Sequence, residues 1–91
     1  MVSVLIRHKV TSFKEWLPAF RDHADARRMF GCQAATVYPP TKDDGDVAVL
    51  LRWADPQRFR EYMERSGVKE RMAEAGVASA PEITIFGDPV Q

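Results

Sequence analysis

The sequence contains a single cysteine, Cys32, and no CxxC or paired Cys/His pattern. A lone cysteine cannot form an intramolecular disulfide, and a zinc site built on thiolates needs further ligands at a recognisable spacing. Cys32 stands at the start of a predicted strand, where a free thiol behaves as a small apolar packing residue. We therefore expect no disulfide scaffold and no metal site.

Long apolar runs are missing, and so is an excess of charge of one sign. No stretch approaches the roughly 20 apolar residues of a transmembrane helix, and the N-terminus lacks the apolar segment and small-residue cleavage site of a signal peptide. Basic and acidic residues both number 13, so no net charge attracts a nucleic acid. These features predict a cytoplasmic protein that binds neither nucleic acids nor membranes.

The length and the hydrophobic content predict one small globular domain over residues 1–91. The chain has 91 residues, of which 45% are hydrophobic, which is ordinary for a folded domain. A domain of this size buries only about 60–65% of the surface of its unfolded chain. Its core is therefore thin, and apolar surface is left over for a partner.

Four segments have the composition of strands. Residues 2–10 are rich in β-branched side chains, and residues 32–38, 47–53 and 82–86 show similar short apolar runs. Asp44-Gly45 lies between the second and third segments and is a strong signal for the turn of a hairpin. The second and third strands should therefore be paired neighbours in an antiparallel sheet.

The first predicted helix begins at Ser12 and ends at Gly31. Ser12 and Glu15 have the spacing of a capping box, and Gly31 is placed to close the helix. Pro18 lies beyond the first turn and should kink the helix or delay its regular part, because proline removes a helical hydrogen bond. The pair Arg27-Arg28 is interpreted as a solvated helix face.

The second predicted helix begins at Asp55-Pro56, where an N-cap residue precedes a proline at the first helical position. Glycine costs about 1 kcal/mol in a helix interior, and serine competes for backbone hydrogen bonds. We therefore expect Ser66-Gly67 to break this helix into two pieces, with the second over residues 68–75.

The element order matches the ferredoxin-like fold, an α+β, βαββαβ sandwich in which helices cover one face of a four-stranded antiparallel sheet. Alternation assigns to the helix-covered face Val4, Ile6, Val37, Val47, Val49, Leu51, Ile83 and Ile85. The opposite face carries Leu5, Arg7, Lys9, Thr36, Tyr38, Ala48, Leu50, Arg52, Thr84 and Phe86. A mixed face of that kind usually meets another protein surface, so we expect a homodimer.

Residues 7–20, 49–55 and 66–83 together resemble the antibiotic biosynthesis monooxygenase-like families of the dimeric α/β-barrel superfamily. The resemblance covers nearly the whole chain and implies a homodimer in which two sheets form a barrel. Some members oxidise aromatic polyketides or quinols with O₂ and without metal or flavin, others cleave haem, and others isomerise or bind small molecules. The haem-degrading branch carries an Asn, Trp and His constellation, and this chain contains no asparagine.

The resemblance implies a cofactor-independent monooxygenase that acts on a small aromatic, phenolic or quinol substrate in the barrel cavity. Such a reaction needs an apolar cavity, a base and groups that stabilise an oxyanion, because the deprotonated substrate supplies the electrons. The alternative is a non-catalytic small-molecule-binding or structural dimer.

His8 is the candidate catalytic base, because a histidine titrates near neutral pH. Its alternative is a polar residue at a strand end, and His23 is interpreted as a boundary residue of the first helix. Trp16 and Trp53 are interpreted as core.

The candidate substrate-binding residues lie on the mixed face of the sheet, where cationic and apolar side chains together would hold a planar anion: Arg7, Tyr38, Leu50, Arg52 and Phe86. Their alternative is an interface with ion pairs, for example to Glu82.

Overall fold

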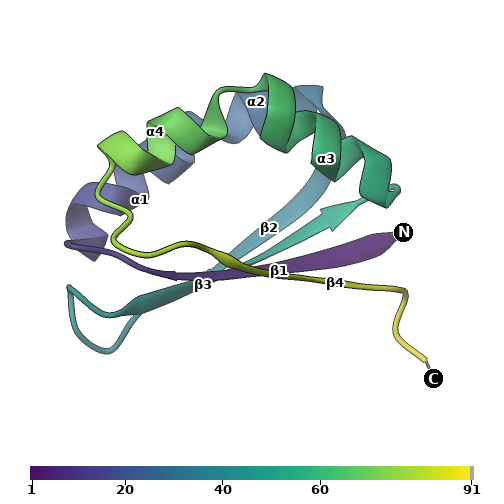
Figure 1. Ribbon diagram of the computed structural model, residues 1–91. Helices are drawn as coiled ribbons and strands as arrows, with labels where there is room; N and C mark the ends of the chain where they lie inside the picture. The colour runs from purple at the N-terminus through teal and green to yellow at the C-terminus, as the bar shows by residue number, and fades with distance from the viewer. Residues whose placement is uncertain (91) are drawn as a thin grey trace.

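The predicted strands form one antiparallel sheet in the computed structural model, which describes residues 1–90. The strand order is β2-β3-β1-β4, with bounds β1 (Val2–Lys9), β2 (Cys32–Tyr38), β3 (Asp46–Trp53) and β4 (Glu82–Phe86). Each helical region has two pieces, α1 (Phe13–Asp22) with α2 (Ala24–Met29) and α3 (Pro56–Arg65) with α4 (Val68–Glu74). All four pieces lie over the same face of the sheet (Figure 1), which confirms the α+β, ferredoxin-like βαββαβ fold.

Most of the core residues that come from strands belong to the middle strands β1 and β3. They pair along their full length, from Val2 opposite Trp53 to Lys9 opposite Asp46. Side chains along β3 alternate strictly between buried and more exposed positions, because helices cover only one face. The predicted face assignment is confirmed for the buried side chains Val4, Val47, Val49 and Leu51.

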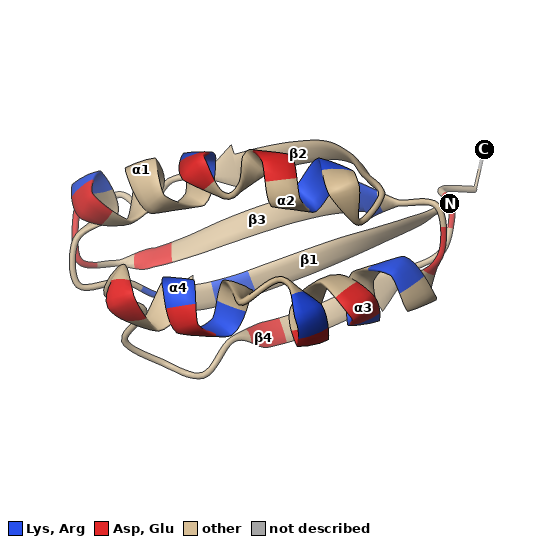
Figure 2. Ribbon diagram, turned by 90° about the horizontal axis from the view of Figure 1, so that it is seen from above, with Lys and Arg blue, Asp and Glu red and all other residues tan. Residues whose placement is uncertain are grey.

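The edge strand β4 is only partly covered. Ile83 lies opposite Ile6 and Ile85 lies opposite Val4, so both have the expected register for the helix-covered face. They are nevertheless 41% and 40% exposed. Figure 2 shows α1 and α2 in one row and α3 and α4 in a second row, with β1 and β3 visible between them.

The N-terminus of α1 is capped from two sides. The Ser12 hydroxyl accepts a hydrogen bond from the Glu15 N–H at 3.4 Å, as predicted. The carboxylate of Asp43 in the β2–β3 loop accepts from the Ser12 hydroxyl at 2.7 Å and from the Lys14 N–H at 3.0 Å. No bond from the Ser12 N–H to the Glu15 carboxylate is present among residues 1–90, and Asp43 instead accepts from two other N–H groups of the first turn, that of Lys14 through its carboxylate and that of Phe13 through its carbonyl.

The interruption in the first helical region lies at His23, five residues beyond Pro18, and the kink expected at Pro18 stays a prediction. α1 continues through Pro18, and His23 leaves the helical conformation with φ −87° and ψ 3°. Pro18 and Lys14 are both exposed, so water can bond the Lys14 carbonyl that proline leaves without a partner. Gly31 follows α2 with a φ of +103°, which confirms it at the predicted helix end.

The predicted break at Ser66-Gly67 is confirmed. Gly67 adopts the left-handed conformation with φ 77°, and α4 begins at the next residue. The Ser66 hydroxyl bonds the Tyr62 carbonyl and accepts from the Val68 N–H at 3.2 Å, so it serves both helix ends. None of the helices described over residues 1–90 is long and apolar enough to cross a membrane.

Candidate functional site

A cavity of about 590 Å³ lies between the sheet and the helices. Its floor is formed by Ile6 of β1 and by Val49 and Leu51 of β3, and α1 contributes Trp16 and Phe20. The volume lies within the roughly 300–1,000 Å³ of small-molecule sites, which are typically apolar with a few polar groups. The cavity can therefore hold an aromatic molecule of moderate size.

The cavity is open on one side and closed on the other. Its exposed lining residues come from α4, from β4 and from the segment between them: Lys69, Ala73, Ser79, Pro81 and Ile83. Phe20, Arg27 and Tyr62, which line the cavity from α1, α2 and α3, are buried. The mouth therefore lies between α4 and β4, and the inner end lies beneath α2 and α3.

His8 lines the cavity and is only 7% exposed. Its ring meets the Trp16 ring edge-on, with 5.7 Å between the centroids. Its Nδ1 atom lies 3.4 Å from the Lys9 carbonyl oxygen. A carbonyl oxygen can only accept, so this contact favours the tautomer with the proton on Nδ1 and a lone pair on Nε2.

Burial lowers the pKa of His8, while the Lys9 carbonyl and the Asp46 carboxylate act in the opposite direction. The neutral, basic form therefore predominates at pH 7. The assignment of His8 as the catalytic base stays a prediction.

Tyr62 of α3 places a second polar group in the cavity wall. Its hydroxyl oxygen lies 2.8 Å from the Nδ1 atom of His23, the residue that separates α1 from α2. Burial raises the pKa of Tyr62 to about 12, although the nearby Arg27 charge opposes the shift. Tyr62 therefore stays protonated at neutral pH. In the sequence, Tyr62 lies on the apolar side of the second predicted helix, and this position predicts only a core residue.

Arg27 is the functional candidate that the sequence interpretation missed. The interpretation of Arg27-Arg28 as a solvated face is correct for Arg28 but wrong for Arg27, which is 5% exposed. The Arg27 guanidinium donates to the Phe20 carbonyl at 2.8 Å and lies 3.8 Å from the Phe20 ring centroid. Arg27 follows Phe20 by seven residues, and this helical spacing is the signal that could have identified it.

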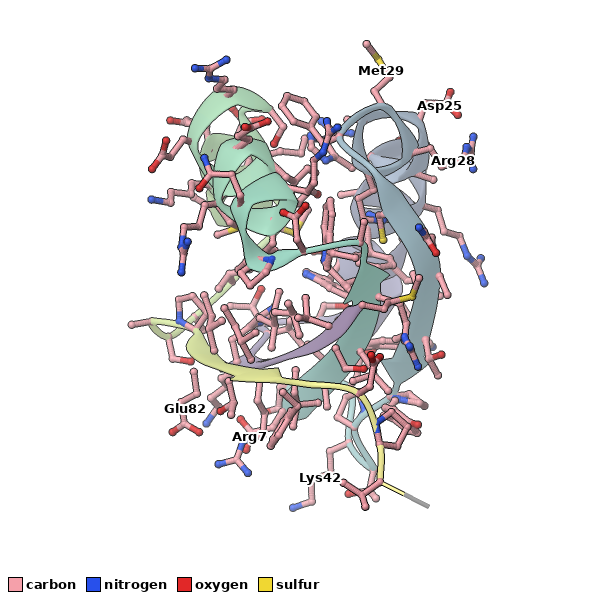
Figure 3. The ribbon with its side chains drawn as sticks, turned by 90° about the vertical axis from the view of Figure 1, so that its right-hand side faces the viewer. Arg7, Asp25, Arg28, Met29, Lys42 and Glu82 are labelled. Carbon is pink, nitrogen blue, oxygen red and sulfur yellow. The ribbon has the colours of Figure 1, made fainter. Side chains whose placement is uncertain are left out.

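The five predicted substrate-binding side chains lie on the sheet face opposite the cavity: Arg7, Tyr38, Leu50, Arg52 and Phe86. Arg7 forms an ion pair with Glu82 at 3.3 Å, which confirms the pairing considered as its alternative, and Arg52 pairs with Asp88 at 3.7 Å. Figure 3 shows Arg7 and Glu82 projecting together on the side away from the helices. None of the five lines the cavity, and binding of substrate by them stays a prediction.

The interpretation of both tryptophans as core residues is confirmed. Trp16 is 1% exposed and Trp53 is fully buried. Trp16 stacks on Phe20 with 5.0 Å between the ring centroids, and Trp53 packs against Phe59 and Tyr62. Trp16 thereby forms both core and cavity wall.

Comparisons with known proteins identify the fold. No protein-family model and no curated protein matches the sequence. Among solved structures, an antibiotic biosynthesis monooxygenase superposes with a TM-score of 0.77 at 17% identity, over 100% of both chains. SnoaB, a cofactor-independent oxygenase from Streptomyces nogalater, gives 0.78 at 19% identity, over 99% of this chain and 94% of its own.

A further match is a monooxygenase from Streptomyces coelicolor, from the gene ActVA-Orf6, in complex with nanaomycin D. It has a TM-score of 0.74 at 14% identity and covers 99% of this chain and 88% of its own. The sequence identities are low and the structural coverage is nearly complete, so these likenesses establish architecture rather than chemistry. The chain has the fold of the antibiotic biosynthesis monooxygenases.

Proposed function

We propose that this chain is a cofactor-independent monooxygenase that binds a small aromatic, phenolic or quinol substrate between the sheet and the helices. The observation that carries the proposal is the cavity of about 590 Å³, which has an apolar floor and a buried histidine in its wall. The fold shared with SnoaB, described as a cofactor-independent oxygenase, supports the reaction type.

His8 is the base in this proposal. A phenol bound with its hydroxyl toward Nε2 transfers its proton to the imidazole, and the resulting phenolate is electron-rich enough to reduce O₂. For a phenol with hydrogen on the para carbon, the sum is phenol plus O₂ to quinone plus water. The substrate loses four electrons, one oxygen atom enters the ring, and the other leaves as water.

The cavity wall assists this step in two ways. Its low polarity strengthens the interaction between a developing anion and nearby dipoles or charges. The rings of Trp16 and Phe20, stacked at 5.0 Å between centroids, offer apolar surface against which a flat substrate packs.

The open sheet face supports a homodimer as the working form. Leu5 lies opposite Leu50, and Tyr38 and Phe86 are 52% and 49% exposed on the same face. Two such faces, packed together, would enclose a barrel with about 800 Å² buried per partner at the standard size. In that assembly the five side chains first considered for substrate binding lie at or near the interface.

Oxygen consumption tests the catalytic proposal directly. An O₂ electrode is used with a panel of hydroquinones and 1-naphthol, with matched reactions without protein to correct for autoxidation. The wild type should consume O₂ and form quinone, and His8→Gln should lose at least about tenfold in rate while still binding the same compounds. Lys42→Gln, in the exposed β2–β3 loop (Figure 3), is the control and should match the wild type.

Two outcomes contradict the proposal in different ways. Binding by calorimetry without O₂ consumption would replace the oxygenase by a non-catalytic small-molecule-binding protein. Equal turnover in wild type and His8→Gln would remove His8 as the base.

A further inference from the structure

We infer that the cavity selects an elongated aromatic anion, whose acidic group is held by Arg27 at the inner end and whose phenolic end reaches His8. The inference rests on the proposed function in that it uses the same cavity. It adds the charge, the shape and the orientation of the ligand.

Among residues 1–90, the charge of Arg27 has no counter-ion. The side chain is 5% exposed, and the ion pairs among residues 1–90 involve Arg7, Arg28, Arg52, Arg71 and the N-terminal amine instead. Taking a charged group out of water is costly unless a partner compensates it. An anionic ligand supplies that partner.

The hydrogen bonds of Arg27 leave room for such a ligand. A guanidinium has five N–H donors; here Nη1 bonds the Phe20 carbonyl, and the Tyr62 hydroxyl interacts with a second donor. This bond caps the last turn of α1 and holds the planar group in place. The remaining donors suit the two oxygens of a carboxylate, which guanidinium binds in a bidentate manner.

The whole cavity lining has the same sign of charge. It includes the cations Arg27 and Lys69 and no aspartate or glutamate, although the chain carries 13 acidic residues against 13 basic ones. Lys69 is exposed at the mouth, whereas Arg27 is buried at the inner end. A path lined by one sign of charge concentrates and guides the oppositely charged ligand.

The positions of the rings define the orientation. His8 meets Trp16 at 5.7 Å between centroids, Trp16 stacks on Phe20 at 5.0 Å, and the Arg27 guanidinium carbon lies 3.8 Å from the Phe20 centroid. His8 and Arg27 are therefore the two ends of one row of contacts. A flat molecule along this row places its acidic group at one end and its hydroxyl at the other.

The probe is 6-hydroxy-2-naphthoate, which carries a carboxylate and a hydroxyl at opposite ends of two fused rings. Its methyl ester has the same shape without the charge. Calorimetry should show the acid binding at least about tenfold more tightly than the ester to the wild type, as expected for charged hydrogen bonds. In Arg27→Met this preference should disappear, with ester affinity changed by less than about threefold, and Arg27→Lys should keep part of it.

Arg28→Met is the matched control, because Arg28 is the neighbouring arginine on α2 and points away from the sheet (Figure 3). Arg28 and Arg27 also border a smaller hollow of about 180 Å³ beside Cys32. Arg28→Met should retain the preference for the acid. An equal loss in both variants would place the anion in that hollow and overturn the inference.

The result on the wild type alone separates the two proposals, so the test does not depend on Arg27→Met folding. Equal binding of acid and ester overturns the anion selectivity and leaves the proposed binding function standing. No binding of either compound, or of the neutral phenols, would overturn both.

Discussion

Both histidines are held in the neutral form by their surroundings. His8 packs on Trp16 beside the cavity, and His23 bonds Tyr62 between α1 and α2. Burial lowers the pKa of each ring. Around His8 the Lys9 carbonyl and Asp46 oppose this shift, whereas the cations Arg27 and Arg71 reinforce it at His23, where the Ser66 carbonyl opposes it.

Mild acid should therefore destabilise the fold before carboxylates titrate. An unfolded histidine takes up its proton near pH 6.5, and the folded state resists it to lower pH. The unfolded state then binds more protons, so stability is complete above pH 6.5 and falls as the pH drops from there toward the lowered pKa values. Thermal melts followed by circular dichroism at pH 7, 6 and 5 should show a falling Tm. The double variant His8→Gln/His23→Gln should show a flatter profile, and an unchanged slope would contradict this account.

At the scale of single residues, the sequence shows which side chains are apolar or charged, but it is a weaker guide to which of them are buried. Apolar residues follow one another at near-helical spacing in the first helical region; Trp16 and Phe20 among them are buried, whereas Met29 is 84% exposed. Arginine is rarely buried, and this general preference outweighed the periodicity that places Arg27 beside Phe20. Whether a charged side chain is buried depends on the residues that surround it in the folded structure. Its neighbours in the sequence do not reveal those residues.

At the scale of elements, two glycines with positive φ join helices to their neighbours under different constraints. Gly67 has a φ of +77° and open space around it, whereas a Cβ on Gly76, with a φ of +90°, would lie 2.4 Å from the Thr11 hydroxyl oxygen. The Gly76 carbonyl also accepts a hydrogen bond from the Thr11 N–H at 2.9 Å. Gly76 therefore connects the end of α4 to Thr11, in the segment after β1, by a hydrogen bond and a close contact.

Substitution of each glycine by alanine should distinguish the cost of backbone strain from the cost of a steric clash. Gly67→Ala should lower the free energy of unfolding by about 1 kcal/mol, the usual cost of the left-handed conformation for a residue with a side chain. Gly76→Ala should cost more, because the new methyl group also displaces Thr11. Urea unfolding measures both, and Thr11→Ala should recover part of the Gly76→Ala loss in a double-mutant cycle. Similar losses for the two single variants would contradict the assigned contact.

The elements themselves were largely predictable because their signals are local. The break at Ser66-Gly67 and the helix end at Gly31 follow from residue types that favour these conformations. The role of Asp43 could not be found in this way, since it caps a helix whose N-cap residue, Ser12, lies 31 residues earlier. Such a contact exists only once the β2–β3 loop has folded back to the start of α1.

At the scale of the whole molecule, alternation identified the two faces of the sheet but not the position of the cavity. The candidate substrate site was expected on the open face, whereas the observed cavity lies under the helices. Alternation shows which residues share a face. The separation between helices and sheet depends on packing between distant elements, and here the cavity opens between α4 and the edge strand β4.

The open face should make the protein a homodimer at micromolar concentration, and Leu50→Asp should dissociate it. Leu50 lies opposite Leu5 and Thr36 in the middle of this face, so a carboxylate there would be desolvated at the sheet–sheet contact. Sedimentation equilibrium should give about twice the 10.3 kDa monomer mass for the wild type and the monomer mass for Leu50→Asp. Met29→Asp adds the same charge at an exposed apolar residue on the helix side (Figure 3) and should remain dimeric. Far-UV circular dichroism distinguishes a folded monomer from an unfolded chain, and either result for Leu50→Asp agrees with an obligate interface. A wild type that sediments as a monomer throughout this range, or a Leu50→Asp variant that stays dimeric, would contradict it.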